Sequence, residues 1–368
     1  MAAQDVLRAE IVIDLDAIRH NVALLTGRAA ASGAETMVVV KADGYGHGAV
    51  PVARAALDVG ATWLGVCTVT EALALRDAGL TTPILAWLEA PGTDLRAAAD
   101  ADIQLSVCTP DQLRAALDAG VTDLHLKIDT GLSRNGCPPG DWPALVRLAA
   151  STKANVRAVW SHLACADEPG HPSIDLQAKR FDEAYLTALD AGLTPARHLA
   201  NSAATLTRGD LHFDLVRAGI AVYGLNPVPQ PEDLRPAMTF RSTVVLTKRI
   251  RAGESVSYGH AWTTPKDTTL ALVPAGYADG VPRTLSGRMD VWLRGKRRTV
   301  AGRVCMDQVV IDCGDERVQV GDEVVLFGAG THGEPTAREW ADTLGTIDYE
   351  IVTGMYRPRV RRRYLGAS

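Results

Sequence analysis

One short phrase recurs along the first half of the chain, and it constrains the fold more than any other feature of the sequence. It reads Asp-Val-Gly-Ala-Thr at 58–62, Asp-Ala-Gly-Leu-Thr at 77–81, Asp-Ala-Gly-Val-Thr at 118–122 and Asp-Ala-Gly-Leu-Thr at 190–194. Each copy follows a segment with helical spacing and precedes a short apolar run, so each glycine is expected at the left-handed C-cap of a helix. Helices that end in this way just before strands are typical of repeated βα units.

The apolar runs between these helices predict eight strands. They follow an initial strand at 9–15 and a helix at 16–32, and they lie at 36–41, 63–67, 83–87, 103–107, 123–128, 156–162, 197–200 and 215–217. Eight strand–helix units in about 200 residues favour a (β/α)₈ barrel. A doubly wound open sheet remains the alternative, because the strand count does not exclude it.

A second domain is expected after a proline-rich linker at 226–236. Glycine turns beyond it separate short apolar runs, which is typical of a mainly β domain. The predicted boundaries are 9–232 for the barrel and 233–368 for the β domain, and the strand at 9–15 could join the second. The strands expected there are 240–247, 268–274, 290–294, 299–304, 308–312 and 322–327, with one helix near 336–344.

Composition excludes several classes of protein. A hydrophobic fraction of 47% supports a large core, and a net charge of −5 gives no sign of a nucleic-acid groove. Six scattered cysteines without a Cys-x-x-Cys pair predict reduced thiols in a cytoplasmic protein, and they argue against a metal site. We find neither a signal peptide nor an apolar run near the roughly 20 residues of a membrane span.

A lysine stands where the first barrel strand should still be apolar. The β-branched residues 38–40 lead directly into Lys41, and glycines follow at 44, 46 and 48. Burial penalises an ammonium group, so a lysine at a strand end beside a glycine-rich turn is a candidate Schiff-base residue. The alternative is a lysine whose amine simply extends into solvent, and these residues alone leave the two balanced.

Further polar residues follow the later strands of the predicted barrel. Because functional residues of such barrels collect where strands end, these groups should share one face and bind an anionic ligand there. Asn201-Ser202 could open a helix and Gly219-Ile220 offers free amides, and both suit a phosphate. His162 and His198 taken singly would more often be satisfied core histidines, as we interpret His125 and His20. The set comprises Lys41, Lys127, Asp129, Arg134, Ser161, His162, His198, Asn201, Ser202, Arg217, Gly219 and Ile220.

Three phrases in the second domain place aromatic or polar residues beside turns. They are Val256-Ser-Tyr-Gly259, Gly276-Tyr-Ala-Asp-Gly280 and Gly302-Arg-Val-Cys-Met-Asp-Gln308. Taken with Lys41-Ala-Asp-Gly-Tyr-Gly-His-Gly48 and Lys127-Ile-Asp-Thr-Gly-Leu-Ser-Arg134, they resemble alanine racemase, the pyridoxal-phosphate enzyme of fold type III. The resemblance extends from about residue 9 to 365. It implies an N-terminal barrel, a C-terminal β domain and a head-to-tail homodimer that interconverts L- and D-alanine, supplying D-alanine for peptidoglycan.

The resemblance also implies a role for each matching residue. Lys41 would bind pyridoxal phosphate covalently and act as one catalytic base, and Tyr258 of the partner subunit would act as the other. Lys127, often carbamylated in the family, would orient Arg134, and His198 would support Arg217 or the base network. The remaining roles are a phosphate cradle of Tyr45, Asn201, Ser202, Gly219 and Ile220, ring contacts from Arg217 and His162, carboxylate binding by Arg134 and the Met306 backbone, and an access channel at Tyr277 and Asp279, with Asp307 in support.

The sequence departs from the family near its C-terminal end. The family often has a phosphate-contacting tyrosine where Arg357 stands here, and Tyr356 lies one position earlier. Whether Tyr356 takes that role stays open, and so does the width of the substrate gate. A broad-spectrum racemase of the same fold is the alternative function, and a non-catalytic pyridoxal-phosphate carrier is a more distant one.

Overall fold

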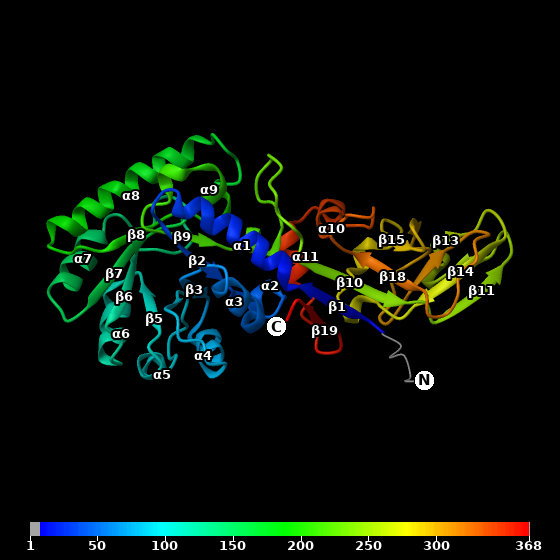
Figure 1. The fold of residues 1–368 in the computed structure, drawn as a ribbon, viewed down its shortest axis with the longest axis horizontal. Helices are drawn as coiled ribbons and strands as arrows, with labels where there is room; N and C mark the ends of the chain where they lie inside the picture. The colour runs from blue at the N-terminus through cyan, green and yellow to red at the C-terminus, as the bar shows by residue number, and fades with distance from the viewer. Residues whose placement is uncertain (1–7, 368) are drawn as a thin grey trace. The chain divides into compact units, whose positions relative to one another are not determined.

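The computed structural model describes residues 8–367. The chain forms two compact units (Figure 1): one runs from Ala17 to Arg235, and the other combines the segment up to Asp16 with the segment from Pro236 onward. Each unit is built around its own sheet system. No helix within 8–367 is long and apolar enough to cross a bilayer.

The first unit is a parallel eight-stranded barrel. Its strands follow the order β8-β7-β6-β5-β4-β3-β2-β9, and the two end strands meet through Asp214 N–H donating to Arg197 O at 3.1 Å and Arg217 N–H donating to Ala200 O at 2.9 Å. These bonds close the sheet, so the barrel prediction is confirmed and the open sheet was wrong. The strands are β2 (Glu35–Val39), β3 (Trp63–Val66), β4 (Ile84–Ala86), β5 (Gln104–Val107), β6 (Asp123–Lys127), β7 (Asn155–Trp160), β8 (Ala196–His198) and β9 (Leu215–Ala218).

Helices lie outside these strands, as Figure 1 shows for α3 to α8. The glycines of the recurring phrase end α3, α4, α6 and α8 with φ values of 102°, 81°, 94° and 85°, which confirms the predicted left-handed caps. The helices are α1 (Leu15–Ala30), α2 (Lys41–Tyr45), α3 (Ala49–Leu57), α4 (Val69–Asp77), α5 (Leu95–Asp100), α6 (Pro110–Asp118), α7 (Trp142–Ala150), α8 (Pro172–Asp190) and α9 (Ser202–Thr207), with 3₁₀ turns η1 (Gly209–Leu211) and η2 (Ile220–Tyr223).

Several barrel strands are shorter than predicted, and two of these differences bear on the site. β2 ends at Val39 rather than 41, and β7 ends at Trp160 rather than 162. In both cases the polar residue at the expected strand end belongs to the segment that leaves the barrel. Lys41 and His162 therefore lie in the βα connections, where their side chains are not constrained by strand alternation.

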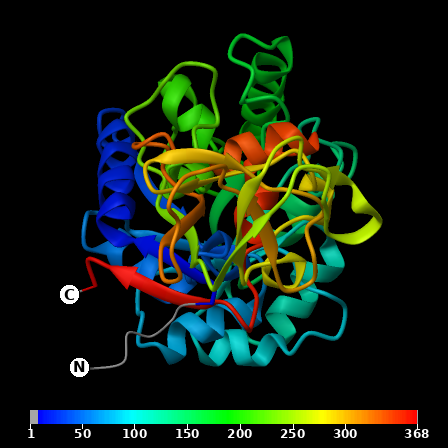
Figure 2. The same cartoon turned by 90° about the vertical axis from the view of Figure 1, so that its right-hand side faces the viewer.

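The second unit is mainly β, as predicted, and Figure 2 shows its strands with β19 in red. A six-stranded sheet has the order β16-β15-β18-β10-β1-β19, in which β1 (Glu10–Asp14) runs antiparallel to β10 and parallel to β19. The remaining elements are β10 (Met238–Thr243), β11 (Leu246–Ile250), β12 (Ser255–Val256), η3 (Tyr258–His260), β13 (Trp262–Thr263), β14 (Thr268–Val273), η4 (Tyr277–Asp279), η5 (Arg283–Leu285), β15 (Asp290–Leu293), β16 (Lys296–Thr299), β17 (Val309–Asp312), β18 (Glu323–Phe327), α10 (Ala337–Leu344), α11 (Asp348–Thr353) and β19 (Arg361–Leu365).

Some predicted strands of this unit were wrong in their limits. The run 240–247 is two strands, because the chain passes from the six-stranded sheet to the three-stranded sheet β11-β14-β17 after Thr243. The strand expected at 299–304 lies instead at Lys296–Thr299. Arg294 and Gly295, with φ values of 54° and 75°, form a two-residue hairpin turn there.

Candidate active site

Lys41 opens an unusual left-handed turn at the carboxyl end of β2. The next residues, Ala42, Asp43 and Gly44, have φ values of 52°, 52° and 62°, a region that costs residues with a Cβ roughly 1–2 kcal/mol each. Glu71 of α4 stabilises this turn, since its Oε1 accepts the Ala42 N–H at 2.8 Å. The turn directs the chain out of the barrel immediately at Lys41.

Burial gives Lys41 the chemistry expected of a nucleophilic amine. Desolvation lowers its pKa below the usual value, and the positive charge of Arg134 lowers it further. The Lys41 ammonium lies 5.8 Å from the centre of the Tyr45 ring. A larger fraction of this amine is therefore neutral near pH 7 than for a solvated lysine.

Tyr45, Ser202 and Gly219 converge from three connections of the barrel. Ser202 Oγ accepts the Gly219 N–H at 2.8 Å, and a Cβ added at Gly219 would lie 2.7 Å from Tyr45 Oη. Ile220 follows at the start of η2, and Asn201 caps α9 by accepting the Ala204 N–H at 3.1 Å. The structure therefore brings together the predicted phosphate residues in a narrow cradle that only glycine leaves open.

Arg217 is a buried cation whose contacts are all neutral acceptors. Its Nη2 donates to Ser161 O at 2.8 Å and to Leu199 O at 3.1 Å, and lies 3.2 Å from His162 Nδ1. Its Nη1 lies 3.1 Å from His198 Nδ1. Desolvation lowers the Arg217 pKa to about 9. The guanidinium is thus rigidly oriented but has no carboxylate partner among these contacts.

Trp160 at the end of β7 connects the buried cations, and sequence reasoning missed it. The Arg217 guanidinium lies 4.8 Å and the Lys127 ammonium 4.2 Å from its ring centre, and the His198 ring stacks on it at 5.3 Å. Cation–π contacts of this kind stabilise a desolvated positive charge. The position of Trp160 at the end of a barrel strand, beside Ser161-His162, was the sequence signal that could have identified it as a site residue.

Lys127 and Arg134 belong to the connection after β6. Lys127 is 4% exposed, and burial lowers its pKa to about 8. Arg134 is exposed on a loop whose backbone is fixed by Asp129, because Asp129 Oδ1 accepts the N–H groups of Gly131 and Ser133. Burial first, and then the charge of Arg134 among others, also lowers the His162 pKa. Arg134 therefore lies within electrostatic range of the other barrel residues.

The three phrases of the second unit form one cluster of loops. Tyr277 N–H donates to Cys305 O at 3.0 Å, and Ala278 N–H donates to Met306 O at 2.9 Å. Ser257, at φ 66°, donates its hydroxyl to Arg303 O at 2.9 Å. Segments that are 20 to 50 residues apart thus place Tyr258, Tyr277 and Met306 on neighbouring turns, and all three side chains are exposed.

Asp279 has a structural position inside this cluster. Its side chain is buried, its Oδ2 accepts the Gly276 N–H at 2.9 Å, and its Oδ1 lies 3.0 Å from Arg359. Arg359 also contacts Asp307 at 2.7 Å, so Arg359 bridges the two carboxylates. Asp279 and Asp307 therefore stabilise the turn that carries Tyr277. Tyr356 is exposed, and the Arg362 guanidinium lies 4.9 Å from its ring centre.

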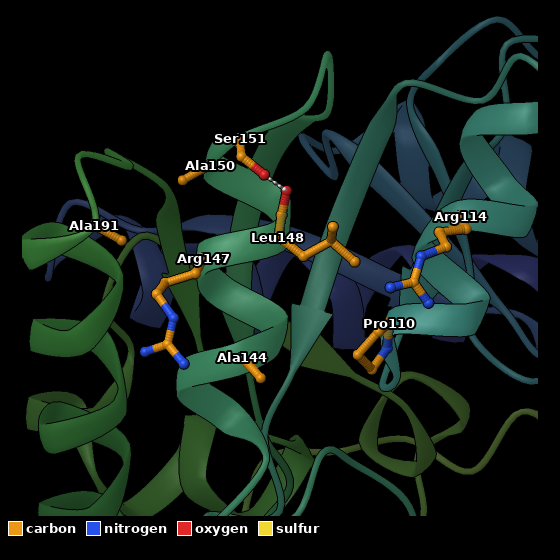
Figure 3. A pocket seen from close by; sticks show the side chains of 8 residues that line it. All are labelled: Pro110, Arg114, Ala144, Arg147, Leu148, Ala150, Ser151 and Ala191. Atoms are coloured by element: carbon orange, nitrogen blue, oxygen red, sulfur yellow. Dashed lines mark hydrogen bonds between the residues drawn. The ribbon is translucent and has the colours of Figure 1, made fainter.

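Two hollows of the barrel lie apart from the residues described above. A surface hollow of about 690 Å³ separates α6, α7 and the end of α8 (Figure 3), and its charged residues are Arg114 and Arg147. It lies among the outer helices rather than at the carboxyl ends of the strands. A second cavity of about 350 Å³ follows β4 and β5 and is lined by Trp87, Cys108 and Asn135 among others. Neither contains Lys41 or Arg217.

Comparison with known proteins agrees with this arrangement. The profile of the alanine racemase N-terminal domain matches residues 13–227, and that of the C-terminal domain matches residues 237–364. An alanine racemase of Salinispora arenicola is 56% identical over 370 residues, covering 98% of this chain and 99% of the relative.

Solved structures give the same result. The alanine racemase of Streptomyces coelicolor A3(2) superimposes with a TM-score of 0.94 at 51% identity, covering 98% of this chain and 99% of that one. The alanine racemase of Bacillus anthracis with bound L-Ala-P has a TM-score of 0.90 at 35% identity, covering 99% and 96%. Sequence and structure therefore agree over nearly the whole length: the chain belongs to the alanine racemase family, isomerases that generally use pyridoxal phosphate.

Proposed function

We propose that this alanine racemase binds pyridoxal phosphate in the barrel, with Lys41 as the covalent attachment residue. The observation that supports this most strongly is the cradle at Gly219, where any side chain would meet Tyr45 Oη at 2.7 Å. Tyr45 and Ser202 are buried and present hydroxyl groups beside it. A phosphate needs hydrogen-bond donors in a confined space, and these residues match that need. When bound, the cofactor would supply an electron sink for the substrate α-carbon.

Arg217 would face the nitrogen of the cofactor ring and His162 would lie beside the ring. Arginine donates hydrogen bonds but gives up its proton reluctantly, even with the pKa lowered to about 9. The Arg217 guanidinium would therefore hydrogen-bond the ring nitrogen without protonating it, and this would suppress side reactions such as transamination. The burial of Arg217 between Ser161 O and Leu199 O supports a fixed orientation toward the cofactor.

Racemisation requires a base on each face of the α-carbon, and we assign Lys41 and Tyr258. Lys41 would remove the proton of D-alanine and Tyr258 that of L-alanine, each returning a proton in the opposite direction. The lowered pKa of Lys41 supports its part, because a neutral amine is the working base. Arg134 and the backbone of Met306 would hold the substrate carboxylate. A carbamate on Lys127 would orient Arg134.

A head-to-tail homodimer would deliver Tyr258 to the site of the partner subunit. Tyr258 is 69% exposed and Met306 52% exposed, which is unusual for groups that need a dry environment for catalysis. Their exposure on ordered turns supports a surface that a second copy of the chain covers. The six free thiols support the cytoplasmic location expected from composition, where the product D-alanine would supply peptidoglycan synthesis.

The test is L-alanine with the cofactor-loaded protein in deuterated water, following optical rotation and α-deuteration together. The two-base assignment predicts loss of rotation with deuterium uptake, and neither pyruvate nor amine. Tyr258→Phe should slow removal of the L-alanine proton by at least about a hundredfold while exchange of D-alanine is affected less. Equal losses for both enantiomers would contradict the assignment. The same assay with L-serine distinguishes a strict enzyme from the broad-spectrum alternative.

A further inference from the structure

A row of hydrogen-bonded side chains runs from Arg217 across the barrel interior to β5. His198 Nδ1 lies 3.1 Å from Arg217 Nη1, and His198 Nε2 lies 2.9 Å from His125 Nδ1. His125 Nε2 lies 2.9 Å from Gln104 Oε1, where the row ends. Arg217, His198, His125 and Gln104 come from β9, β8, β6 and β5, and none is more than 6% exposed.

The donor chemistry of arginine fixes the direction of every bond in this row. A guanidinium has only donors, so His198 Nδ1 must be the acceptor and the His198 proton must be on Nε2. That proton is donated to His125 Nδ1, which leaves the His125 proton on Nε2 for Gln104 Oε1. Reversing any one bond would place two donors against each other. The row therefore has one consistent set of tautomers.

The same residues keep the imidazoles uncharged. Burial first, together with the charges of Arg157 and Arg217, lowers the His125 pKa to about 3. Burial and the Arg217 charge lower the His198 pKa as well. The far end of the row is an amide, and a carboxylate there would instead attract a second proton onto the histidine pair. Gln104 thus ends the row without changing its charge.

Packing fixes the two rings in this orientation. The His198 ring stacks on Trp160 at 5.3 Å with an interplanar angle of 12°, and the His125 ring meets the edge of Trp63 at 5.7 Å. A flip of either ring would put carbon atoms where the bonded nitrogens lie and would break the hydrogen bonds of the row. Because both orientation and tautomer are set, His198 offers Arg217 one acceptor at a constant position.

We propose that Gln104 and His125 are positioning residues. They hold His198 in the Nε2–H tautomer, in which Nδ1 accepts from Arg217, so that Arg217 keeps its positive charge and its orientation. The inference rests on the proposed function of Arg217 toward the cofactor ring. It assigns a role to two residues that touch neither the cofactor nor the substrate. It also explains why an amide, a neutral group, stands on β5 at the end of a row of buried polar side chains.

Nitrogen NMR of the full-length protein labelled in histidine tests the arrangement, with and without pyridoxal phosphate. Protonated and unprotonated ring nitrogens have separate chemical shifts, so each tautomer is read directly. We expect His198 and His125 to be Nε2–H tautomers and to stay neutral down to about pH 5. A His198 proton on Nδ1, or a charged His125 at neutral pH, would overturn the inference even if the enzyme racemises alanine normally.

Two variants and one control separate positioning from simple stability. His125→Leu should shift both His198 nitrogens, because Nε2–H loses its acceptor, and Gln104→Glu should bring a proton onto His125. The control is His212→Leu: His212 is equally buried and bonded to Ser32 Oγ and Thr205 O, outside the row. It should leave the His198 shifts unchanged.

The loaded enzyme supplies a second measurement. His125→Leu should raise the amount of pyruvate formed per racemisation event by about tenfold, which corresponds to about 1.4 kcal/mol in the relative barriers of the two reactions. His212→Leu should not change this ratio even where it lowers thermal stability. An unchanged ratio together with unchanged His198 shifts in both row variants would refute the positioning role. If the protein without substitutions does not racemise alanine at all, the proposed function is refuted instead.

Discussion

Removing the carboxylate of Glu71 should release the turn that presents Lys41. Glu71 lies on α4 and accepts three backbone N–H groups: Ala42 at 2.8 Å, Cys67 at 2.7 Å and Thr68 at 3.3 Å. It also forms the capping box of α4 with Thr68. The bond to Ala42 is the one that matters for the site, because it anchors a residue held at φ 52°.

The expected loss of stability follows from the number of short hydrogen bonds that Glu71 accepts. Hydrogen bonds to a charged acceptor contribute about 1.5–3 kcal/mol each, so losing the bonds to Ala42 and Cys67 should cost about 3 kcal/mol. Glu339 is the matched control, because it forms the same capping box with Thr336 on α10 but, among residues 8–367, accepts from no residue with a left-handed backbone. Glu339→Ala should cost about 1 kcal/mol.

Hydrogen exchange of the peptide that contains Ala42 is the direct assay. In Glu71→Ala the Ala42 amide should exchange about a hundredfold faster, while Glu339→Ala leaves that peptide unchanged. Glu71 also raises the pKa of Lys41, so Glu71→Gln should lower the pH at which the cofactor attaches. If the Ala42 amide exchanges at its original rate in Glu71→Ala, the turn is held by other contacts and our reasoning is wrong.

Three further predictions concern the barrel residues. Lys127, with its pKa lowered to about 8, gains neutral amine as pH rises toward 8, so labelled bicarbonate should give a carbamate NMR signal that strengthens from about pH 7 to 8 and is absent in Lys127→Ala. Gly219→Ala should weaken pyridoxal-phosphate binding at least about tenfold in a fluorescence titration, because its Cβ would lie 2.7 Å from Tyr45 Oη, whereas Gly209→Ala, with 3.6 Å to its nearest neighbour, should bind normally. Arg217→Glu should raise transamination relative to racemisation, and an unchanged yield of pyruvate would refute the assigned role.

The barrel could be predicted because its signals are local. Each glycine of the recurring phrase caps one helix, and each apolar run forms one strand buried on both faces, so no long-range information was needed. The helix opened by Asn201 was predictable for the same reason, since an N-cap acts within three residues. Strand β16 was missed because Lys296, Arg297 and Arg298 are poor strand formers, and hairpin pairing with β15 decides their conformation.

The site itself was predictable only in part. Residues within motifs were named as candidates from the sequence, and the structure brings the barrel members together. Gln104 and Trp160 were not singled out and His125 was interpreted as a core histidine, because each is an ordinary core residue by type and only the closed barrel connects them to Arg217. Contacts between strands far apart in sequence leave no pattern in a single chain. Glu71 was also missed. Its position in the sequence predicts the capping box of α4, but not the further hydrogen bond that it accepts from Ala42.

The basic side chains at one end of the barrel form a cluster of positive charge. Lys41, Lys127, Arg134 and Arg217 are four cations at one end of the barrel, and within residues 8–367 none of them has a carboxylate within 4 Å. Cations withdrawn from water without a carboxylate partner destabilise a fold, so a bound anion would stabilise this cluster. In the proposed function, a cofactor phosphate and a substrate carboxylate would carry that negative charge. The neutral histidines, the amide of Gln104 and the ring of Trp160 orient the cations without neutralising them, which leaves their charge for those two ligands.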